Sequence, residues 1–144
     1  MIQDDTIKLL RECDSGMRMA MDALNEAIDE VESDAFKRCL VESKHDHQQL
    51  KEEINTRLHE LHDEGKEPST FAKGMAWLKT NVRMELNDSD ECIADLLTEG
   101  CFMGIKGLQR YLNQYKAADD RSRELAGKLI CLEERLAADI RPYL

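Results

Sequence analysis

The chain has 144 residues, of which 42% are hydrophobic and 35% are charged. With 30 acidic against 20 basic residues, its formal net charge at pH 7 is -10, which repels both nucleic acid and anionic lipid. We therefore expect no nucleic acid and no membrane among its partners. A chain of this length is about one domain, and we expect residues 1–144 to form a single domain around one core.

The cysteines indicate the compartment. Their odd number, irregular spacing and lack of any C-x-x-C pair argue for reduced thiols. No basic stretch followed by an apolar run stands at the N-terminus, and no run of 18 apolar residues occurs anywhere, so the sequence predicts neither a signal peptide nor a membrane span. We therefore expect a cytoplasmic protein. The five cysteines are Cys13, Cys39, Cys92, Cys101 and Cys131.

The apolar residues recur at helical spacing along the chain. Only two prolines and seven glycines interrupt it, and neither strand alternation nor hairpin dipeptides occur. Asp4 or Asp5 is expected to cap a first helix that runs to about Val31. The sequence therefore predicts an all-helical protein.

The second helix is expected over about residues 35–63. Ser33 or Asp34 would cap it, and so short a break predicts an antiparallel hairpin with the first helix. Gly65 is a candidate for its left-handed cap, and Pro68 prevents continuation. One face of this helix carries Phe36, Leu40, Leu50, Ile54, Leu58 and Leu61, and His47 interrupts that face.

The remaining elements set the topology. A shorter helix is expected over about residues 69–86, and two more long helices over about 90–115 and 119–141. The connector from residue 65 to 86 is long enough to travel back along the bundle, since sixteen or so helical residues span ~24 Å. The sequence therefore predicts an all-α, ferritin-like four-helix bundle of up-down-down-up topology, with a short crossover helix between helices two and three.

Four stretches also resemble a family of small ferritin-like proteins, mostly bacterial, that is catalogued as a domain of unknown function. They are Glu12-Cys13-Asp14-Ser15-Gly16, Gly65-Lys66-Glu67-Pro68, Trp77-Leu78-Lys79 and Thr98-Glu99-Gly100. The likeness runs through nearly the whole chain. It implies the ferritin-like fold and no established activity.

Iron sites of the wider ferritin-like class use one Glu from each of two helices and Glu-x-x-His from each of the other two. The chain has one literal match, from Glu42 to His45. At 100° per residue both lie opposite the apolar stripe of their helix, so we expect this motif to face solvent. Helix four offers no second copy, and we expect no complete di-iron site.

The same angular spacing places a different polar set on the inner faces: Asp14 on helix one, His47 on helix two, Cys101 on helix three and Glu133 on helix four. Along the bundle axis these residues are expected within roughly 10 Å of one another. A buried carboxylate persists only if it is paired, hydrogen-bonded or bound to a metal. The four residues therefore form one candidate layer.

Three interpretations of this layer stay open. In the first, Asp14 and His47 form a buried pair, joined by Glu133 and water, that fixes the register of the helices. In the second, Asp14, His47 and Glu133 bind a metal, with Cys101 as a softer fourth ligand, a donor set that suits zinc or ferrous iron. In the third, some of the side chains reach outward and no layer exists.

The third long helix has two further features. Gly100, Gly104 and Gly107 are expected on its inner side, where they allow close packing or leave a groove for a small ligand. Several apolar residues fall outside the single inner stripes and indicate a second face to cover, so we expect a homodimer. They are Met19, Phe102, Met103 and Ile130, although Met103, like Met17, Met21 and Met75, is also expected to fill gaps in the core.

No phosphate-binding loop and no catalytic Ser/His/Asp order is present in the sequence. We expect a non-enzymatic structural or interaction protein with no cofactor, whose partner is a second copy of itself. The alternative is a protein that binds iron or zinc at a degenerate site around Asp14, His47 and Glu133.

Overall fold

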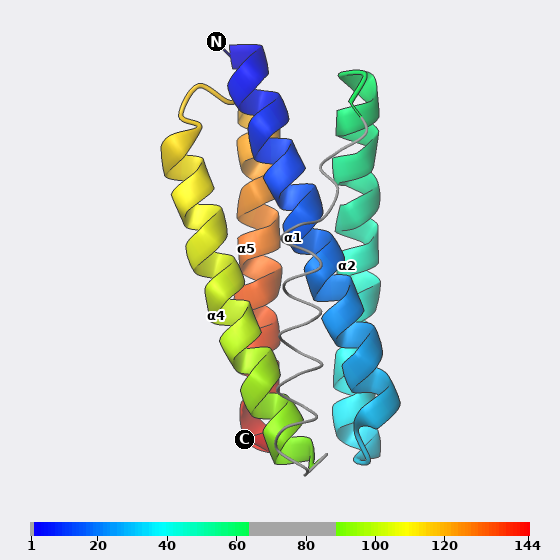
Figure 1. Ribbon diagram of the computed structural model, residues 1–144. Coiled ribbons are helices and arrows are strands. Elements are labelled where there is room, and N and C mark those ends of the chain that lie inside the picture. The colour runs from blue at the N-terminus through cyan, green and yellow to red at the C-terminus, as the bar shows by residue number, and fades with distance from the viewer. Residues whose placement is uncertain (1, 64–88) are drawn as a thin grey trace.

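The structure is a computed structural model that describes residues 2–63 and 89–144 (Figure 1). These residues form four long α-helices and one short 3-10 helix, without a strand among them, which confirms the all-α prediction for this part of the chain. The crossover helix expected over residues 69–86 lies outside the described residues. The elements are α1 (Ile2–Glu30), α2 (Asp34–Glu60), α4 (Asp90–Gln114), α5 (Asp120–Ile140) and η1 (Arg141–Tyr143).

Three of the helices begin at a side chain that caps them. Ser33 before α2, Ser89 before α4 and Asp119 before α5 each accept a hydrogen bond from the backbone N–H three residues on, at 3.2, 3.2 and 2.8 Å. Each bond satisfies one of the N–H groups that a helix start leaves without a partner, which stabilises it by about 1 kcal/mol. Of the two residues predicted to cap the second helix, Ser33 supplies the side-chain cap.

The predicted cap of the first helix is wrong. Because α1 already begins at Ile2, Asp4 and Asp5 lie inside its first turn. The carboxylate of Asp5 instead accepts a hydrogen bond from the backbone N–H of Ala117, at 3.0 Å, in the loop between α4 and α5. Acidic residues at this helix end still interact favourably with its dipole.

The C-terminus of α2 lies earlier than predicted. His62, with φ at 58°, adopts the left-handed conformation that was expected of Gly65, which lies outside the described residues. The N–H groups of His62 and Asp63 donate back to the carbonyls of His59 and Leu58, at 3.0 and 2.9 Å. A left-handed residue with these two bonds is the Schellman ending of a helix.

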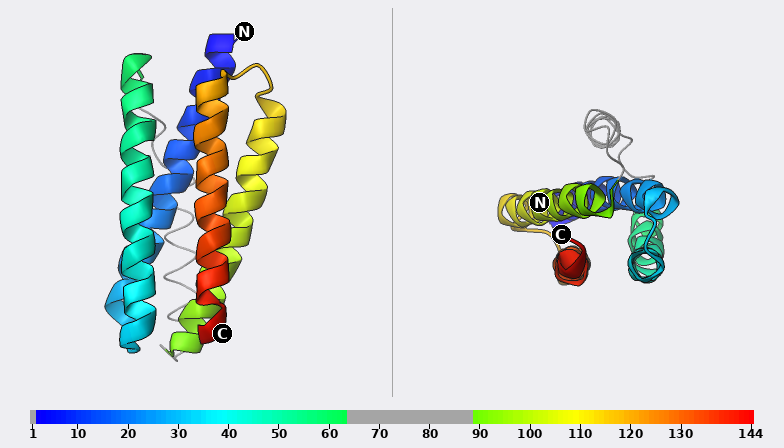
Figure 2. Two further views of the ribbon diagram at one scale, coloured as in Figure 1. Left: turned by 180° about the vertical axis from the view of Figure 1, so that it is seen from behind. Right: turned by 90° about the horizontal axis from the view of Figure 1, so that it is seen from below.

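Hydrogen bonds at the two ends of the bundle fix which helix ends meet. At one end the Asp90 carboxylate accepts from the N–H groups of Glu32 and Ser33, both at 2.9 Å, so α4 begins beside the loop between α1 and α2. At the other end the N–H of Asp119 donates to the Thr6 hydroxyl at 2.8 Å, so α5 begins beside the start of α1. In Figures 1 and 2, α1 and α5 accordingly run in one direction and α2 and α4 in the other.

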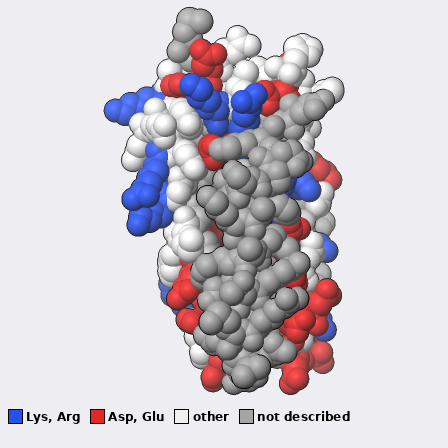
Figure 3. Space-filling view, viewed as in Figure 1, with Lys and Arg blue, Asp and Glu red and all other residues white. Residues whose placement is uncertain are grey.

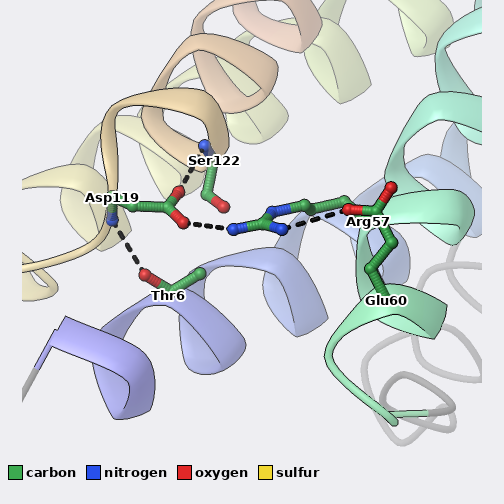
Figure 4. Close-up of polar contacts among 5 residues, drawn as sticks. All are labelled: Thr6, Arg57, Glu60, Asp119 and Ser122. Carbon is green, nitrogen blue, oxygen red and sulfur yellow. Dashed lines mark hydrogen bonds and ion pairs between the residues drawn. The ribbon is translucent and has the colours of Figure 1, made fainter.

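A polar network joins α1, α2 and α5 at the second of these ends (Figure 4). The Arg57 guanidinium donates to the Asp119 carboxylate at 2.5 Å and to Glu60 at 3.0 Å. Burial alone raises the pKa of Asp119, but the hydrogen bonds from Ser122 and Arg57 outweigh it and hold that pKa below its usual value. One carboxylate therefore caps α5 and ties it to α2, while the backbone N–H of the same residue binds Thr6.

The buried apolar residues of the described helices form two clusters. Along α2, Leu40 belongs to one cluster and Leu50 to the other, and His47 lies between them. Along α5, Ile130 and Leu136 are divided in the same way. The first cluster includes Leu9, Leu10, Met17, Ile54, Leu58, Leu108, Leu125 and Leu129, and the second includes Leu24, Val31, Phe36, Ile93, Leu97 and Ile140.

Candidate functional site

The structure buries all four residues of the predicted polar layer, as expected. The exposed fractions are 0% for Asp14 and His47, 2% for Cys101 and 6% for Glu133. Burial at this level is costly for polar side chains unless each has a partner. The partners therefore decide what this site is.

His47 makes its hydrogen bonds to its own helix and to α5. Its Nδ1 lies 2.7 Å from the carbonyl oxygen of Ser43, one turn earlier, and 3.3 Å from the Ser43 hydroxyl. Its Nε2 lies 3.0 Å from Oε1 of Glu133. Both ring nitrogens thus have partners, and the second bond joins α2 to α5 at the level between the two apolar clusters.

These contacts determine how many protons the pair holds. Because a carbonyl oxygen only accepts, Nδ1 of His47 must carry a hydrogen and donate it to Ser43. Nε2 and the Glu133 oxygen would repel each other at 3.0 Å if neither carried a hydrogen. The imidazole and the carboxyl group therefore share one further proton, which makes the pair neutral overall.

The pKa of His47 agrees with this arrangement. Burial alone lowers it, but the hydrogen bond and charge of Glu133, followed by the Ser43 carbonyl and the charge of Asp46, raise it above its usual value. The protonated imidazole is thus stabilised within the bundle. The pair resembles an internal ion pair more than a free histidine available to a substrate.

Cys101 lies beside the same carboxylate. The pKa of its thiol is raised by burial first, then by the charge of Glu133 and a hydrogen bond to it. Opposite, Glu133 packs over Gly104: a Cβ at that position would lie 3.9 Å from Cγ, Cδ and Oε2 of Glu133, an ordinary contact distance. Three helices, α2, α4 and α5, therefore contribute to one small polar layer.

The other predicted glycines are not packed. Among the described residues, a Cβ at Gly100 or at Gly107 would meet nothing within 4 Å, and Gly100 is exposed, so its predicted inward position is wrong. The inner face of α4 is instead defined by residues such as Leu97, Cys101 and Leu108.

Asp14 is not the partner of His47. Its carboxylate forms an ion pair with Arg18, one turn later on α1, at 3.3 Å, while the hydrogen bonds of His47 go to Ser43 and Glu133. The predicted Asp14–His47 pair is therefore replaced by the pair of His47 with Glu133. Within residues 2–63 and 89–144, no three His, Cys, Asp or Glu side chains are grouped so as to hold a metal ion.

Sequence reasoning also missed polar residues that the structure buries. Glu12, Cys13 and Ser15 are buried together with Asp14, so α1 is covered around its whole circumference at this level. A single inward stripe cannot indicate such a stretch, because four consecutive residues point in all directions around a helix. The first stretch of the family resemblance was the one signal that marked these residues.

The remaining histidine motifs lie on the surface. Glu42 and His45 are both exposed, which confirms that the single Glu-x-x-His match points away from the core. His59 and His62 near the end of α2 are exposed as well. These residues therefore contribute nothing to an internal site.

The comparisons with known proteins found no relative of the chain. No protein-family model, no curated protein and no solved structure matches the chain. The resemblance to the ferritin-like family of unknown function thus stays a prediction. Among the helices that the structure describes, none is long and apolar enough to cross a membrane.

Proposed function

We propose that the protein is a non-enzymatic structural or interaction protein without a complete di-iron site. The observation that carries this proposal is the His47–Glu133 pair. Both ring nitrogens of His47 are engaged, and the Glu133 carboxylate that a metal or a substrate would need is already bonded to the imidazole. A buried polar pair of this kind specifies helix register, as polar residues do in the cores of coiled coils.

We also propose the ferritin-like, up-down-down-up arrangement with a crossover helix. The bond of Asp90 to the α1–α2 loop and the bond of Asp119 to Thr6 support it, because they place helix starts side by side in the way that this topology requires. A connection from the end of α2 to the start of α4 must then span the length of the bundle.

Metal analysis tests the proposed function. Protein purified without chelator and reconstituted with ferrous iron or zinc should hold no stoichiometric metal. One metal ion per chain that is lost on His47→Ala, but kept on the matched surface change His45→Ala, would contradict a purely structural role. Circular dichroism at 222 nm confirms that each variant is folded.

The alternative function is metal binding at a degenerate site around Asp14, His47, Glu133 and Cys101. The observation that favours it is that Glu133 contacts both His47 and Cys101, whose nitrogen, oxygen and sulfur donors suit zinc or ferrous iron, although within residues 2–63 and 89–144 no three such side chains are grouped so as to hold a metal ion without a rearrangement. Metal binding would displace the shared proton, so it must release protons on loading. Zinc titration of Cys101→Ser against the exposed control Cys131→Ser distinguishes it: equal behaviour of the two variants rules out this sulfur as a ligand.

The proposed partner is a second copy of the chain. Such a homodimer would cover the apolar residues that the bundle leaves exposed. Size-exclusion chromatography with light scattering tests it, and a monomer at high micromolar concentration would rule it out.

A further inference from the structure

Two large apolar side chains stand next to each other on the outer face of α4. Phe102 is 58% exposed and Met103 is 61% exposed. They are the most exposed large hydrophobic residues in the part of the chain that the structure describes. Aromatic and thioether groups that are more than half exposed at adjacent positions are the kind of surface that a partner covers.

Charged residues of opposite sign flank this apolar pair, with acidic residues before it and basic residues after it. Asp95 and Glu99 precede it on the same outer face, and Lys106 and Arg110 follow it. All four are exposed, and none forms an ion pair within residues 2–63 and 89–144. On the side of the molecule where α4 lies in Figure 3, basic side chains accordingly gather toward one end and acidic side chains toward the other.

The spacing of these residues is symmetric about the apolar pair. Glu99 lies three residues before Phe102, and Lys106 lies three residues after Met103. Asp95 and Arg110 lie seven residues before and after in the same way. If a second α4 packs antiparallel across a two-fold axis between positions 102 and 103, each acidic residue meets a basic residue, and Phe102 meets Met103 of the other copy.

We propose that this outer face of α4 is the surface through which two copies of the chain associate, antiparallel and about a two-fold axis. This inference rests on the proposed homodimer and assigns its interface. A surface that pairs with itself in this way is isologous, the commonest form of homodimer contact. The complementary charges set the antiparallel direction, because a parallel pairing would bring like charges together.

The surface between α2 and α5 lacks this pattern. Its charges are already satisfied inside the chain, where Arg121 and Lys128 both pair with Glu53, at 3.3 and 3.5 Å. The outer face of α4 is different because its charges form no ion pair with the other described residues, and a second copy would supply their opposite partners. It extends over residues 95–110, about 22 Å along the helix, so the association is expected to be at the weak end of dimer affinities.

The test uses two double variants, each of which reverses the charges of one sign on this face. The first is Asp95→Lys with Glu99→Lys, which makes the face uniformly basic. The second is Lys106→Glu with Arg110→Glu, which makes it uniformly acidic. Sedimentation velocity at ~0.15 M salt, where the overall charge is largely screened, should show a dimer for the wild type and a monomer for each variant alone. An equimolar mixture of the two variants should form a one-to-one heterodimer.

A second pair of variants separates this surface from a general charge effect. Lys37→Glu with Arg38→Glu, at exposed positions of α2, changes the net charge as much as the acidic variant does and should leave the dimer intact. Phe102→Ala with Met103→Ala removes the apolar centre and should raise the dissociation constant at least about tenfold.

The outcomes separate this interface from the dimer itself. A wild type that stays monomeric at high concentration overturns both. A dimeric wild type whose charge-reversed variants also remain dimeric overturns the interface and leaves the dimer standing. Two monomeric variants whose mixture gives no heterodimer overturn the pairing of acidic with basic residues across this face, and with it the proposed interface.

Discussion

Replacing either member of the His47–Glu133 pair should destabilise the protein far more than replacing both. His47→Leu leaves the Glu133 carboxyl group at a position only 6% exposed, without the nitrogen that lies 3.0 Å from it. Removing one partner of a buried charge pair costs about 3–5 kcal/mol, whereas replacing both by apolar residues of similar size is often neutral or stabilising.

The size of the coupling follows from these two figures. We expect each single change, His47→Leu or Glu133→Leu, to lower the free energy of unfolding by about 3 kcal/mol or more. The double variant should remain within about 1 kcal/mol of the wild type, so that the interaction energy, the sum of the two single losses minus the loss in the double variant, exceeds about 5 kcal/mol. A domain of this size is stable by about 5–15 kcal/mol, so the single variants should still fold.

The pair also predicts the direction of a pH effect. The pKa of His47 in the folded protein lies above its usual value of 6.5, so the folded state keeps a proton that the unfolded state has lost. The resulting stability is fully present below about pH 6.5 and is lost as the pH rises through the folded pKa. Glu133→Gln can still donate a hydrogen bond to neutral His47, so this variant should lose most of that pH dependence.

Urea unfolding followed by circular dichroism at 222 nm, at pH 6 and at pH 9, measures both effects. The matched control is His45→Leu, two residues from His47 but exposed, which should change stability by less than about 0.5 kcal/mol. Losses from His47→Leu and Glu133→Leu that simply add in the double variant would refute the pairing. An advantage of the wild type over Glu133→Gln that grows with pH would refute the sign of the pKa shift.

Three further predictions concern single residues. Asp119→Ala removes a helix cap and an ion pair and should cost about 1–2 kcal/mol at pH 7; because the pKa of Asp119 is lowered in the fold, this difference in urea unfolding should begin to shrink as the pH falls below the usual value of 3.8 and be lost as the pH falls through the lowered pKa. His62→Gly relieves a left-handed conformation, with φ at 58°, and should raise the free energy of unfolding by up to about 1 kcal/mol. In thiol titration of the native protein, exposed Cys131 should react first, whereas buried Cys13, whose pKa is raised to about 12, and buried Cys101 should react only on unfolding.

Each of these has a result that contradicts it. A loss from Asp119→Ala that stays the same however far the pH falls below 3.8 would show that its charge is not the cause. A destabilised His62→Gly variant would mean that the imidazole contributes more than the backbone conformation costs. Rapid native reaction at Cys13 would show that the first apolar cluster, to which it belongs, opens readily.

The helices could be predicted because the signals that specify them are local. The spacing of apolar residues and the serines at the starts of α2 and α4 depend only on near neighbours in the chain. Ser33 and Ser89 accordingly cap the helices that they precede. The end of α2 was missed because a histidine supplies the left-handed residue, which sequence preference assigns to glycine or asparagine.

The partner of His47 could not be predicted because it depends on how the helices cross. An angular step of 100° places Asp14 and Glu133 on inner faces, and both are buried. Which of the two carboxylates reaches the imidazole is decided by the tilt and separation of whole helices, which are not encoded at those positions. The Ser43 carbonyl could not be predicted as a partner of His47 either, because every residue has a backbone carbonyl.

Gly100 and Met103 show the same limit on α4. A glycine has no side chain whose polarity would indicate which face of the helix it occupies. Gly100 lies exposed, next to the apolar inner face of α4. Met103 was expected both as core filling and as part of a second face, and its 61% exposure confirms the second expectation and makes the first wrong. Amphipathic spacing alone does not distinguish an apolar residue that packs into the core from one that is exposed on the surface.

The His47–Glu133 pair limits how far the helices of the bundle can shift along one another. Leucines of the two apolar clusters resemble each other, so hydrophobic burial alone would tolerate a shift of α2 against α5 by one turn. Such a shift would move His47 away from Glu133 and leave a charge buried without its partner, so the pair permits one register only. Outside the bundle, Phe102 and Met103 of α4 are exposed between charges of opposite sign, and the proposed dimer would cover them.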